Sequence, residues 1–381
     1  MKKILFIHTF YQNKGGEDIA VENELNLLDE IFEVETLFFS NNIKNYFLEV
    51  FSFIFNRNIK NERLLNQKIS EFQPDIVYVH NTWFAASLGI FNVLKKRNIK
   101  VLLKLHNLRF NCTRTYLSKK HFDKISICLC CGQKREDVGF FNKYFDDSFF
   151  KSLYVTKYGK KYFKILNEMD LTILVLTSFH KKFLNSLNIN NKIEIFPNYI
   201  DVSKNTVNSK KLPYLVYAGR ISEEKGVKEL INAFLNSGID DLKLKIIGNG
   251  PLLKSLLDIK YKNIEFLGEK ENKEVLEIIQ NSFGVITATK LYEGQPTLLC
   301  EASSLGVPSI FPNTGGISEF FPEEYLLTFE QFNYKDLERK INLLYTSREH
   351  TLIGEENKEF ILNQLDKNNL ISSFSQIAQN D

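Results

Sequence analysis

Residues 214–235 read YLVYAGRISEEKGVKELINAFL, and this stretch predicts a strand, a turn and a helix in succession. YLVYAG (214–219) is an apolar run typical of a buried parallel strand. After the turn, apolar residues recur at the spacing of one helix face, at Val227, Leu230, Ile231, Phe234 and Leu235. Gly238 then ends the helix. Strand, turn and helix in this order form the repeating unit of a parallel α/β sheet.

The same alternation continues on both sides of this stretch. In the second half, apolar runs predict further strands at 243–248, 264–268, 284–289 and 307–312. In the first half they predict strands at 3–10, 75–81, 101–107, 173–178 and 193–198. Helical patterns lie between the runs, and one of them begins at about Glu17. Strands separated by helices predict an α/β fold built on doubly wound parallel sheets.

Length and a polar segment divide the chain. A chain of 381 residues is too long for one ordinary core and predicts two domains. The polar stretch DVSKNTVNSKKLP (201–213) has the composition of a linker. We therefore predict a first domain over 1–200 and a second over 201–381. A last helical pattern at about 367–378 is expected to cross back onto the first domain.

Composition excludes several classes of protein. No apolar run is long enough to span a membrane, and the start MKKILFIHTF (1–10) turns polar too early for a signal peptide. We therefore expect a cytoplasmic protein, whose five cysteines would be reduced thiols or metal ligands rather than disulfides. The chain has no dense basic run with interleaved aromatic residues, which disfavours nucleic acid as a partner.

Charge is distributed unevenly along the chain. Residues 1–200 hold 29 Lys and Arg against 20 Asp and Glu, a net charge of +9. Residues 201–381 hold 20 against 26, a net charge of −6. A basic half suggests that the first domain meets an anionic surface or ligand. The alternative is charge scattered over the solvated faces of both domains.

Residues that follow the predicted strands are candidates for ligand binding, because open α/β sheets bind ligands beyond the carboxyl ends of their strands. These positions hold tight glycine turns, cations and carboxylates, at Gly15, Gly16, Arg220, Lys225, Gly248, Asn249, Gly250, Glu293 and Glu301. Bare backbone N–H groups and cations suit a diphosphate, and carboxylates suit sugar hydroxyls, so together they suit a nucleotide sugar. Taken singly, the two neighbouring glycines also fit a simple helix entry, and the two glutamates a solvated helix start.

The stretch LYEGQPTLLCE (291–301) holds those two glutamates. In one continuous helix, Glu293 and Glu301 would lie on different faces. Gly294, however, suits an irregular approach, and Pro296 suits the first turn of a helix. We therefore predict a loop that carries Glu293 and a helix that carries Glu301 about one turn inside.

Three segments of the second half resemble the C-terminal half of glycosyltransferase family 4: YAGRISEEKGVKELINAF, KIIGNGP and EGQPTLLCEASSLGVPSIFPNTGGISEF. Glu293 and Glu301 match the E-x7-E motif of that family. GGED (15–18) and KLHN (104–107) are similar to segments of its first domain. The resemblance implies a bacterial enzyme of the surface-polysaccharide type. It also implies the GT-B fold, in which two Rossmann-like domains face a cleft.

The resemblance implies roles for individual residues. Arg220 and Lys225 would hold the donor diphosphate and stabilise the negative charge that develops as it leaves. Glu301 would bind the ribose hydroxyls, and Glu293 the transferred sugar. His106 would act near the anomeric centre, or would instead be a hydrogen-bonded histidine at a strand end. Further donor contacts are implied for Gly15, Gly16, Gly248, Asn249, Gly250, Gly294, Gln295, Pro296 and Thr297. The family's usual Phe-Gly after the first glutamate is Gly-Gln-Pro here.

By the same resemblance, we expect transfer of a sugar, with retention of configuration, from a nucleotide-diphosphate sugar (UDP-sugar favoured) to a saccharide hydroxyl. The acceptor would be lipid-linked, in assembly of capsule, lipopolysaccharide O-antigen or exopolysaccharide. No cofactor is expected. The chain lacks an Asp-x-Asp triplet, so we also expect no catalytic divalent metal. The alternatives are a GT-B-fold nucleotide-sugar epimerase and a non-catalytic sugar-nucleotide-binding partner.

Four cysteines follow His106 within a short stretch, at Cys112, Cys128, Cys130 and Cys131. Cys128-x-x-Cys131 with Cys112 has part of the spacing of a structural zinc site, which His121 or Cys130 could complete. The alternative is a group of unligated thiols.

Two segments of the first domain could rest on a membrane. NYFLEVFSFIF (45–55) is aromatic and apolar, and KSLYVTKYGKKYFKIL (151–166) is basic and aromatic, with lysines at Lys157, Lys160, Lys161 and Lys164. Together they would meet the anionic inner face of the cytoplasmic membrane and admit a lipid-linked acceptor. The alternative is a core helix beside a solvated basic helix.

Overall fold

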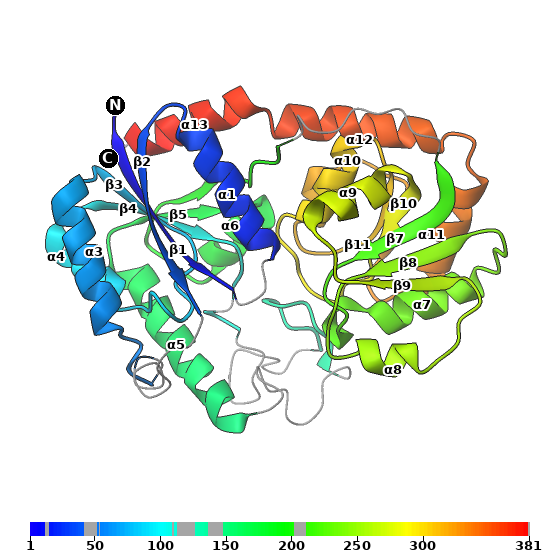
Figure 1. The fold of residues 1–381 in the computed structure, drawn as a ribbon, viewed down its shortest axis with the longest axis horizontal. Helices are drawn as coiled ribbons and strands as arrows, with labels where there is room; N and C mark the ends of the chain where they lie inside the picture. The colour runs from blue at the N-terminus through cyan, green and yellow to red at the C-terminus, as the bar shows by residue number, and fades with distance from the viewer. Residues whose placement is uncertain are drawn as a thin grey trace. The chain divides into compact units, whose positions relative to one another are not determined.

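The computed structural model describes residues 1–11, 15–41, 52, 54–108, 110–112, 126–135, 148–201 and 211–379. The chain forms two compact units, the first made of Met1–Tyr199 with Lys367–Asp381 and the second of Ile200–Asp366. Each unit has one six-stranded sheet whose neighbouring strands are parallel, with helices on both faces (Figure 1). The predicted fold class is confirmed. The predicted cleft between two facing domains stays a prediction.

The first sheet has the order β2-β1-β3-β4-β5-β6. Its strands are β1 (Lys3–Phe10), β2 (Glu33–Ser40), β3 (Ile76–Val79), β4 (Lys100–Leu105), β5 (Thr172–Val175) and β6 (Ile193–Ile195). The chain winds outward from β1 to β2 and then returns to place β3 on the other side of β1. The order of the strands therefore reverses between β1 and β3.

Helices cover the two faces of this sheet. They are α1 (Gly16–Leu28), α3 (Ile59–Phe72), α4 (Ile90–Arg97), α5 (Phe149–Glu168), α6 (Ser178–Ser186) and α13 (Lys367–Gln379). Successive strand residues point to opposite faces, so Leu5 and Leu103 join the apolar core that also holds residues of α3, α4 and α5. On the other face, Tyr78 contacts side chains of both α1 and α13.

A buried ion pair joins α1 to this second face. The Lys104 ammonium in β4 lies 2.8 Å from the Glu24 carboxylate in α1, and both side chains are fully buried. The Tyr78 hydroxyl donates to the other oxygen of Glu24 at 2.6 Å. Burial raises the pKa of Glu24 and lowers that of Lys104, and each partner's charge opposes that effect. Because a lone buried charge is costly, the pair holds α1 at one position on the sheet.

The C-terminal helix α13 completes the core of the first unit. Phe374 is fully buried, and its ring packs against Phe32, Tyr78 and Phe196 at centroid distances of 5.7, 5.2 and 5.3 Å. The Lys2 ammonium donates to the carbonyl of Ala378 at 3.1 Å. Residues from the two ends of the sequence therefore share one core.

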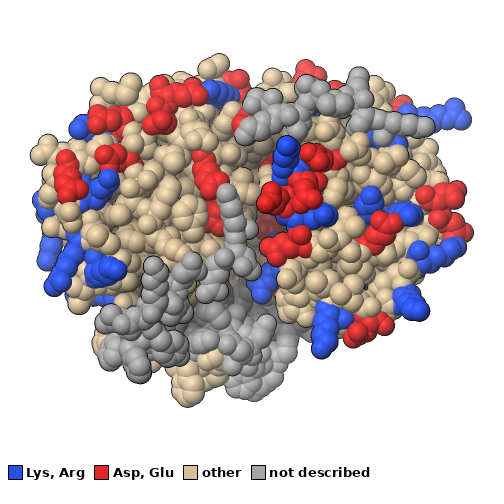
Figure 2. Space-filling model, in the orientation of Figure 1, with Lys and Arg blue, Asp and Glu red and all other residues tan. Residues whose placement is uncertain are grey.

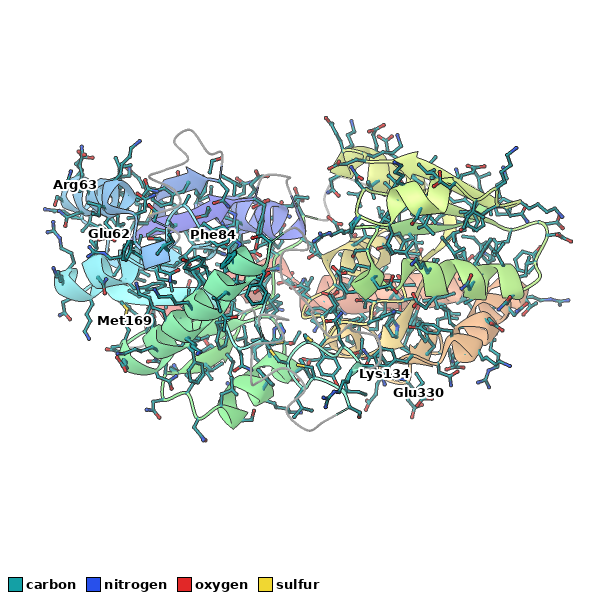
Figure 3. All side chains as sticks on the ribbon, turned by 90° about the horizontal axis from the view of Figure 1, so that it is seen from below. Glu62, Arg63, Phe84, Lys134, Met169 and Glu330 are labelled. Carbon is teal, nitrogen blue, oxygen red and sulfur yellow. The ribbon has the colours of Figure 1, made fainter. Side chains whose placement is uncertain are left out.

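Helix α3 lies on the face of the sheet that bears Leu5 and Leu103, and it buries one charged residue and exposes the next. Glu62 points inward and accepts from Arg57 at 2.5 Å, whereas the adjacent Arg63 points outward (Figure 3).

Charged side chains on the outer surface are mixed in sign. On the face drawn in Figure 2, Lys and Arg are interspersed with Asp and Glu over both units. Among the described residues, no helix is long and apolar enough to cross a membrane.

The second sheet has the order β12-β11-β10-β7-β8-β9. Its strands are β7 (Leu212–Ala218), β8 (Lys243–Ile247), β9 (Ile264–Gly268), β10 (Ser282–Ile286), β11 (Ser309–Asn313) and β12 (Thr328–Glu330). The chain adds β8 and β9 on one side of β7, and then β10, β11 and β12 on the other. The strand order therefore reverses between β7 and β10, as it does in dinucleotide-binding α/β sheets.

The helices of the second unit are α7 (Val227–Asn236), α8 (Leu253–Leu257), α9 (Asn272–Gln280), α10 (Thr297–Ser304), α11 (Tyr334–Thr346) and α12 (His350–Gln364), with short 3₁₀ turns η2 (Glu223–Lys225) and η3 (Ile317–Phe320). The predicted stripe of α7 is buried from Val227 to Phe234, but Leu235 is 41% exposed. That residue was wrongly predicted to face the core.

Two strands of the described residues, β2 and β12, were not predicted from the sequence. β2 (EVETLFFS) is an edge strand with only one buried position, so it lacks the continuous apolar run of a central strand. β12 has three residues, too few to show a period.

We expect Lys104→Met to lower the free energy of unfolding by about 3–5 kcal/mol, because it leaves the Glu24 carboxylate buried without its partner. Adding Glu24→Gln should restore much of the loss. Urea unfolding followed by circular dichroism measures both effects. The control is Lys243→Met, which removes another strand lysine from an exposed pair with Glu265, at an expected cost of at most about 1 kcal/mol. Equal losses in the two single variants would contradict this account.

Candidate functional site

An ion pair lies where the strand order of the second unit reverses. Lys225 ends η2, which follows β7, and Glu293 lies in the loop after β10. The Lys225 ammonium is 2.5 Å from the Glu293 carboxylate, which also accepts from the Thr289 hydroxyl at 3.0 Å. Both charged side chains remain about 30% exposed, at 31% and 29%. The structure thus brings together two residues predicted from separate motifs, each within reach of solvent.

Arg220 lies on the loop between β7 and η2. It is exposed, and among the described residues its guanidinium makes no ion pair. Its carbonyl accepts from the Tyr217 hydroxyl at 2.8 Å, which fixes the backbone of the loop. Arg220 therefore presents a positive charge to solvent, whereas the charge of Lys225 is partly neutralised by Glu293.

The turn after β8 supports the loop that carries Arg220. Gly248 and Gly250 have φ angles of +129° and +159°, and a Cβ on either would meet a backbone oxygen of that loop at 2.0 or 2.3 Å. Asn249 accepts from the backbone N–H of Ile221 at 2.8 Å. These contacts give Gly248, Asn249 and Gly250 a role in the fold of the loop. Their predicted contact with a donor stays a prediction.

A second glycine turn holds the backbone of Glu293. The carbonyl of Glu293 accepts from the Gly316 N–H at 2.8 Å. Gly315 has a φ of +60°, and a Cβ there would lie 2.4 Å from that carbonyl. Only a glycine at this position lets the two segments approach so closely.

The segment between the two glutamates has the predicted form. Gly294 and the buried Gln295 precede α10, which begins at Thr297 with Pro296 as its N-cap. The Thr297 N–H donates to the Gln295 carbonyl at 3.0 Å. Glu301 lies about one turn inside α10, as the sequence predicts.

Glu301 itself is buried, with its side chain against α9. Its carboxyl group accepts from the Asn272 amide at 3.3 Å. Burial raises the pKa of Glu301 from 4.5 to about 7, and the Asn272 hydrogen bond opposes that shift. The group therefore changes charge near neutral pH, and it can either donate or accept a hydrogen bond there.

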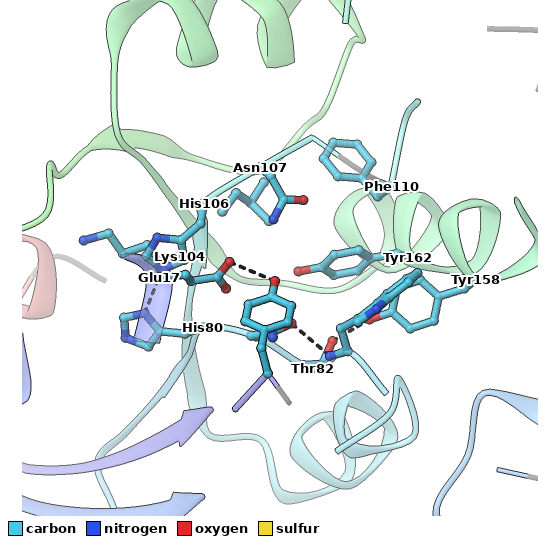
Figure 4. A pocket seen from close by; sticks show the side chains of 13 residues that line it. Glu17, His80, Thr82, Lys104, His106, Asn107, Phe110, Tyr158 and Tyr162 are labelled. Atoms are coloured by element: carbon cyan, nitrogen blue, oxygen red, sulfur yellow. Dashed lines mark hydrogen bonds between the residues drawn. The ribbon is translucent and has the colours of Figure 1, made fainter. Parts of the chain in front are cut away.

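The first unit contains a pocket beside its own reversal point, lined by residues at the carboxyl ends of β1, β3 and β4 (Figure 4). It is lined by Tyr11, Glu17, His80, Asn81, Thr82, Trp83, Lys104, Leu105, His106, Asn107, Phe110, Tyr158 and Tyr162. Tyr11 donates to Glu17 at 3.0 Å, and the hydroxyls of Thr82 and Tyr158 lie 2.7 Å apart. The walls are therefore largely aromatic, with polar groups at defined positions.

His106 lies in this pocket beside a second histidine. Its Nε2 is 3.1 Å from Nδ1 of His80, and burial, followed by nearby positive charge, lowers the pKa of both rings well below 6.5. Both are therefore neutral at pH 7. Among the described residues, His80 Nε2 has no partner, so we assign the His80 proton to Nδ1, which avoids a buried N–H without an acceptor. His106 then carries its own proton on Nδ1.

The predicted glycines stand at the start of α1. A Cβ on Gly15 or Gly16 would meet nothing within 4 Å, so packing among the described residues does not require glycine at either position. The Gly15 N–H is not bare as predicted, because it donates to Asp18 at 3.0 Å. The other oxygen of Asp18 lies 2.7 Å from His8 Nε2, and both side chains are fully buried.

The cysteines of the first unit gather in one place. The sulfur atoms of Cys112, Cys128 and Cys131 all lie within 4.8 Å of one another, and all three residues are buried. His121, the other predicted zinc ligand, lies outside the described residues. The fifth cysteine, Cys300, is buried in α10, far along the chain in the second unit.

One protein family matches the second unit. Residues 200–361 match the family described as glycosyl transferases group 1. The second unit therefore resembles a group 1 glycosyl transferase domain. Its Lys225–Glu293 pair, the Arg220 loop and Glu301 all lie within the matched residues. Membership of family 4 in particular stays a prediction.

Individual proteins resemble the chain more widely. It is 28% identical over 196 residues to the amylovoran biosynthesis glycosyltransferase AmsD of Erwinia amylovora, a match that covers 48% of this chain and 53% of that protein. The match thus spans about half the length of this curated relative. Sucrose-phosphate synthase from Thermosynechococcus elongatus superimposes with a TM-score of 0.70 at 14% identity, over 99% of this chain and 98% of the other. HepE from Anabaena, solved with UDP and glucose, gives 0.68 at 12% identity, over 99% of each chain. These structural neighbours are GT-B glycosyltransferases, and identities this low show the fold alone.

Three residues that position the predicted ones in the second unit were not predicted from the sequence: Thr289, Gly315 and Asn272. Thr289 ends the predicted strand 284–289, so the strand-end rule that selected Glu293 could also have selected Thr289. Gly315 belongs to the segment NTGG (313–316), but its contact with Glu293 depends on tertiary structure. Asn272 follows no motif, and nothing local marks it.

The raised pKa of Glu301 predicts a pH-dependent stability. The folded chain keeps this proton up to about pH 7, whereas the unfolded chain loses it near 4.5, so stability falls as pH rises through that window. Glu301→Gln has no proton to lose and keeps an oxygen for Asn272. We expect the variant to gain about 2 kcal/mol over the wild type between pH 5 and pH 8, measured by urea unfolding. The control Glu277→Gln, at an exposed position of α9, should follow the wild type. A constant difference between Glu301→Gln and wild type would contradict the shift.

Proposed function

We propose that this protein is a glycosyltransferase that moves a sugar from a nucleotide-diphosphate sugar to a hydroxyl of a saccharide acceptor in the assembly of a surface polysaccharide. The observation that carries the proposal is the Lys225–Glu293 pair at the β7/β10 reversal of the second unit, beside the exposed Arg220. The name of AmsD, an amylovoran biosynthesis glycosyltransferase, supports a polysaccharide product.

The donor would bind at the reversal point of the second unit. Arg220 offers a free cation to the diphosphate, and Lys225 would contact the same group from the end of η2. As Lys225 turns to the phosphates, the Glu293 carboxylate can accept hydrogen bonds from the sugar. Glu301 would bind the ribose hydroxyls, for which a carboxyl group with a pKa of about 7 is both a donor and an acceptor. We favour UDP as the nucleotide, and the complex of HepE with UDP and glucose supports that choice.

The reaction would retain the configuration of the sugar. The bond between the anomeric carbon and the diphosphate oxygen breaks, the acceptor oxygen bonds to that carbon, and the acceptor proton passes to the departing diphosphate. Glu293 is held by Lys225 and Thr289, which suits a sugar-binding group better than an attacking nucleophile. Arg220 and Lys225 would stabilise the charge on the diphosphate, so we propose that no divalent metal is needed.

The acceptor would bind in the pocket of the first unit. Tyr11, Phe110, Tyr158 and Tyr162 supply aromatic surface of the kind on which sugar rings pack. His106 lines the same pocket and is neutral at pH 7, so its Nδ1–H can donate to a sugar oxygen without adding charge. The pocket can therefore hold a saccharide by packing and by a few fixed hydrogen bonds.

A face of α5 supports contact with a membrane. Phe150, Leu153, Lys157, Lys160 and Lys164 are exposed and recur every three or four residues, so they lie along one side of the helix. Apolar side chains beside lysines suit an anionic lipid surface. Lys161 lies off this face and donates to the Asn56 carbonyl at 3.1 Å. The other predicted segment, 45–55, lies largely outside the described residues. We propose that this face rests on the inner surface of the cytoplasmic membrane and that the acceptor is lipid-linked.

We expect Lys225→Ala to lower the hydrolysis of UDP-sugars about 10²–10³-fold, because it removes a cation from the departing diphosphate. The readout is release of UDP from a panel of UDP-, GDP- and ADP-sugars. The control is Lys228→Ala, which removes a neighbouring exposed lysine paired with Glu223 and should leave the rate unchanged.

Three outcomes would contradict the proposal for the donor site. The two variants could lose equal activity, or chelator could abolish turnover that magnesium then restores. The wild type could also convert the donor to an epimer without any acceptor, which would indicate a nucleotide-sugar epimerase.

Sedimentation with vesicles tests the membrane proposal. We expect the protein to sediment with vesicles of anionic phospholipid and not with neutral ones. The triple variant Lys157→Gln/Lys160→Gln/Lys164→Gln should weaken binding at least tenfold, since each lysine contributes about 1 kcal/mol near such a surface. The control is Lys95→Gln/Lys96→Gln, at exposed positions of α4. Equal binding of the triple variant and the wild type would remove α5 from the proposal.

A further inference from the structure

Three buried thiols meet from two separate segments of the first unit. Cys112 closes a turn after β4, in which the N–H groups of Asn111 and Cys112 donate to the Leu108 carbonyl at 3.0 and 3.2 Å. Cys128 and Cys131 come from a hairpin over residues 126–135. The exposed fractions of Cys112, Cys128 and Cys131 are 4%, 0% and 8%, so all three sulfurs are withdrawn from solvent.

The hairpin holds its two cysteines at fixed positions. Ile127 and Lys134 form an antiparallel bridge, and the Cys128 N–H donates to the Gln133 carbonyl at 3.0 Å. The Gly132 N–H donates a hydrogen bond to the Cys128 carbonyl at 2.8 Å, and Gly132 has a φ of +80°. This tight turn brings the thiols of a Cys-x-x-Cys pair to the same side of the hairpin, which is how such pairs share a metal.

The spacing of the sulfurs fits a tetrahedral metal. With Zn–S bonds of about 2.3 Å, two thiolates of a zinc site lie about 3.8 Å apart. The sulfurs of Cys112 and Cys128 are 3.8 Å apart, and all three lie within 4.8 Å of one another. A disulfide would join only two of them and requires a sulfur separation of about 2 Å. Three converging thiols therefore suit one metal better than a cross-link.

We propose that Cys112, Cys128 and Cys131 bind one zinc ion as thiolates, each giving up its proton, with a fourth position for a non-cysteine ligand. Cys130 is not one of the three cysteines whose sulfurs lie within 4.8 Å of one another, and its thiol instead donates to the Leu108 carbonyl at 3.6 Å. Zinc is the metal that thiolate ligands in this geometry favour.

The zinc would tie the hairpin to the wall of the pocket. Cys112 follows directly on the segment that places His106, Asn107 and Phe110 in that pocket. Bonds from Cys128 and Cys131 would join this segment to the hairpin over 126–135, where the described contacts are otherwise hydrogen bonds and packing. The ion thus has a structural role, which stands whether or not the protein transfers sugars.

Metal analysis of the full-length protein, purified without chelator from medium that contains zinc, tests the proposal. We expect one zinc ion per chain in the wild type, and a loss of most of it in Cys112→Ser, Cys128→Ser and Cys131→Ser. The matched controls are Cys130→Ser, within the same hairpin, and Cys300→Ser, a buried thiol of the second unit. Both should keep their zinc.

A second measurement on the wild type covers the case in which a variant fails to fold. Titration with a mercurial thiol reagent should release zinc as the thiols react. Replacement by cobalt should give the thiolate-to-metal absorption and visible bands of a tetrahedral sulfur site. Wild-type protein without zinc, retention of zinc by Cys128→Ser, or loss of zinc in Cys130→Ser would overturn the assignment. So would a disulfide between Cys112 and Cys128 in unreduced protein.

Discussion

The first unit depends on the buried ion pair between Glu24 and Lys104. A shift of one residue along α1 would turn the carboxylate by about 100°, away from Lys104 and from the Tyr78 hydroxyl, and would leave both charges buried alone. An apolar contact could stabilise the helix as well, but it would tolerate such a shift. The pair therefore sets the register of α1, and with it the place of Glu17 in the lining of the pocket.

The same topological constraint produces both sites. Each sheet has one point at which the strand order reverses, between β1 and β3 in the first unit and between β7 and β10 in the second. Loops that leave neighbouring strands on opposite sides of the sheet diverge there and leave room for side chains. The aromatic pocket forms at the first point, and the Lys225–Glu293 pair at the second. Two dissimilar sets of residues thus occupy equivalent places in two similar sheets.

The sequence was most informative where a local pattern determines structure. Central strands and the start of α10 at Thr297 were predictable, because apolar runs and a proline at a helix start act over a few residues. The prediction for Leu235 was wrong, because the helical spacing of apolar residues does not show how wide the buried face of the helix is. The partners of predicted residues could not be predicted. Asn272, for example, lies 29 positions from Glu301 and reaches hydrogen-bonding distance only because α9 packs beside α10. Lys104, however, lies inside an apolar strand, and a buried lysine needs an acidic partner, so the sequence did indicate that a buried acid lies nearby in the fold.

The position of α13 has a consequence for synthesis of the chain on the ribosome. The second unit is continuous in sequence, so all of its strands and helices have been synthesised, and emerge from the ribosome, ahead of residue 367. The first unit, although translated first, lacks Phe374 until the second unit has been made, and this ring packs on Phe32, Tyr78 and Phe196. The half made last can therefore finish folding first. The half made first waits with part of its core uncovered, which makes it the part of the nascent chain most in need of a chaperone.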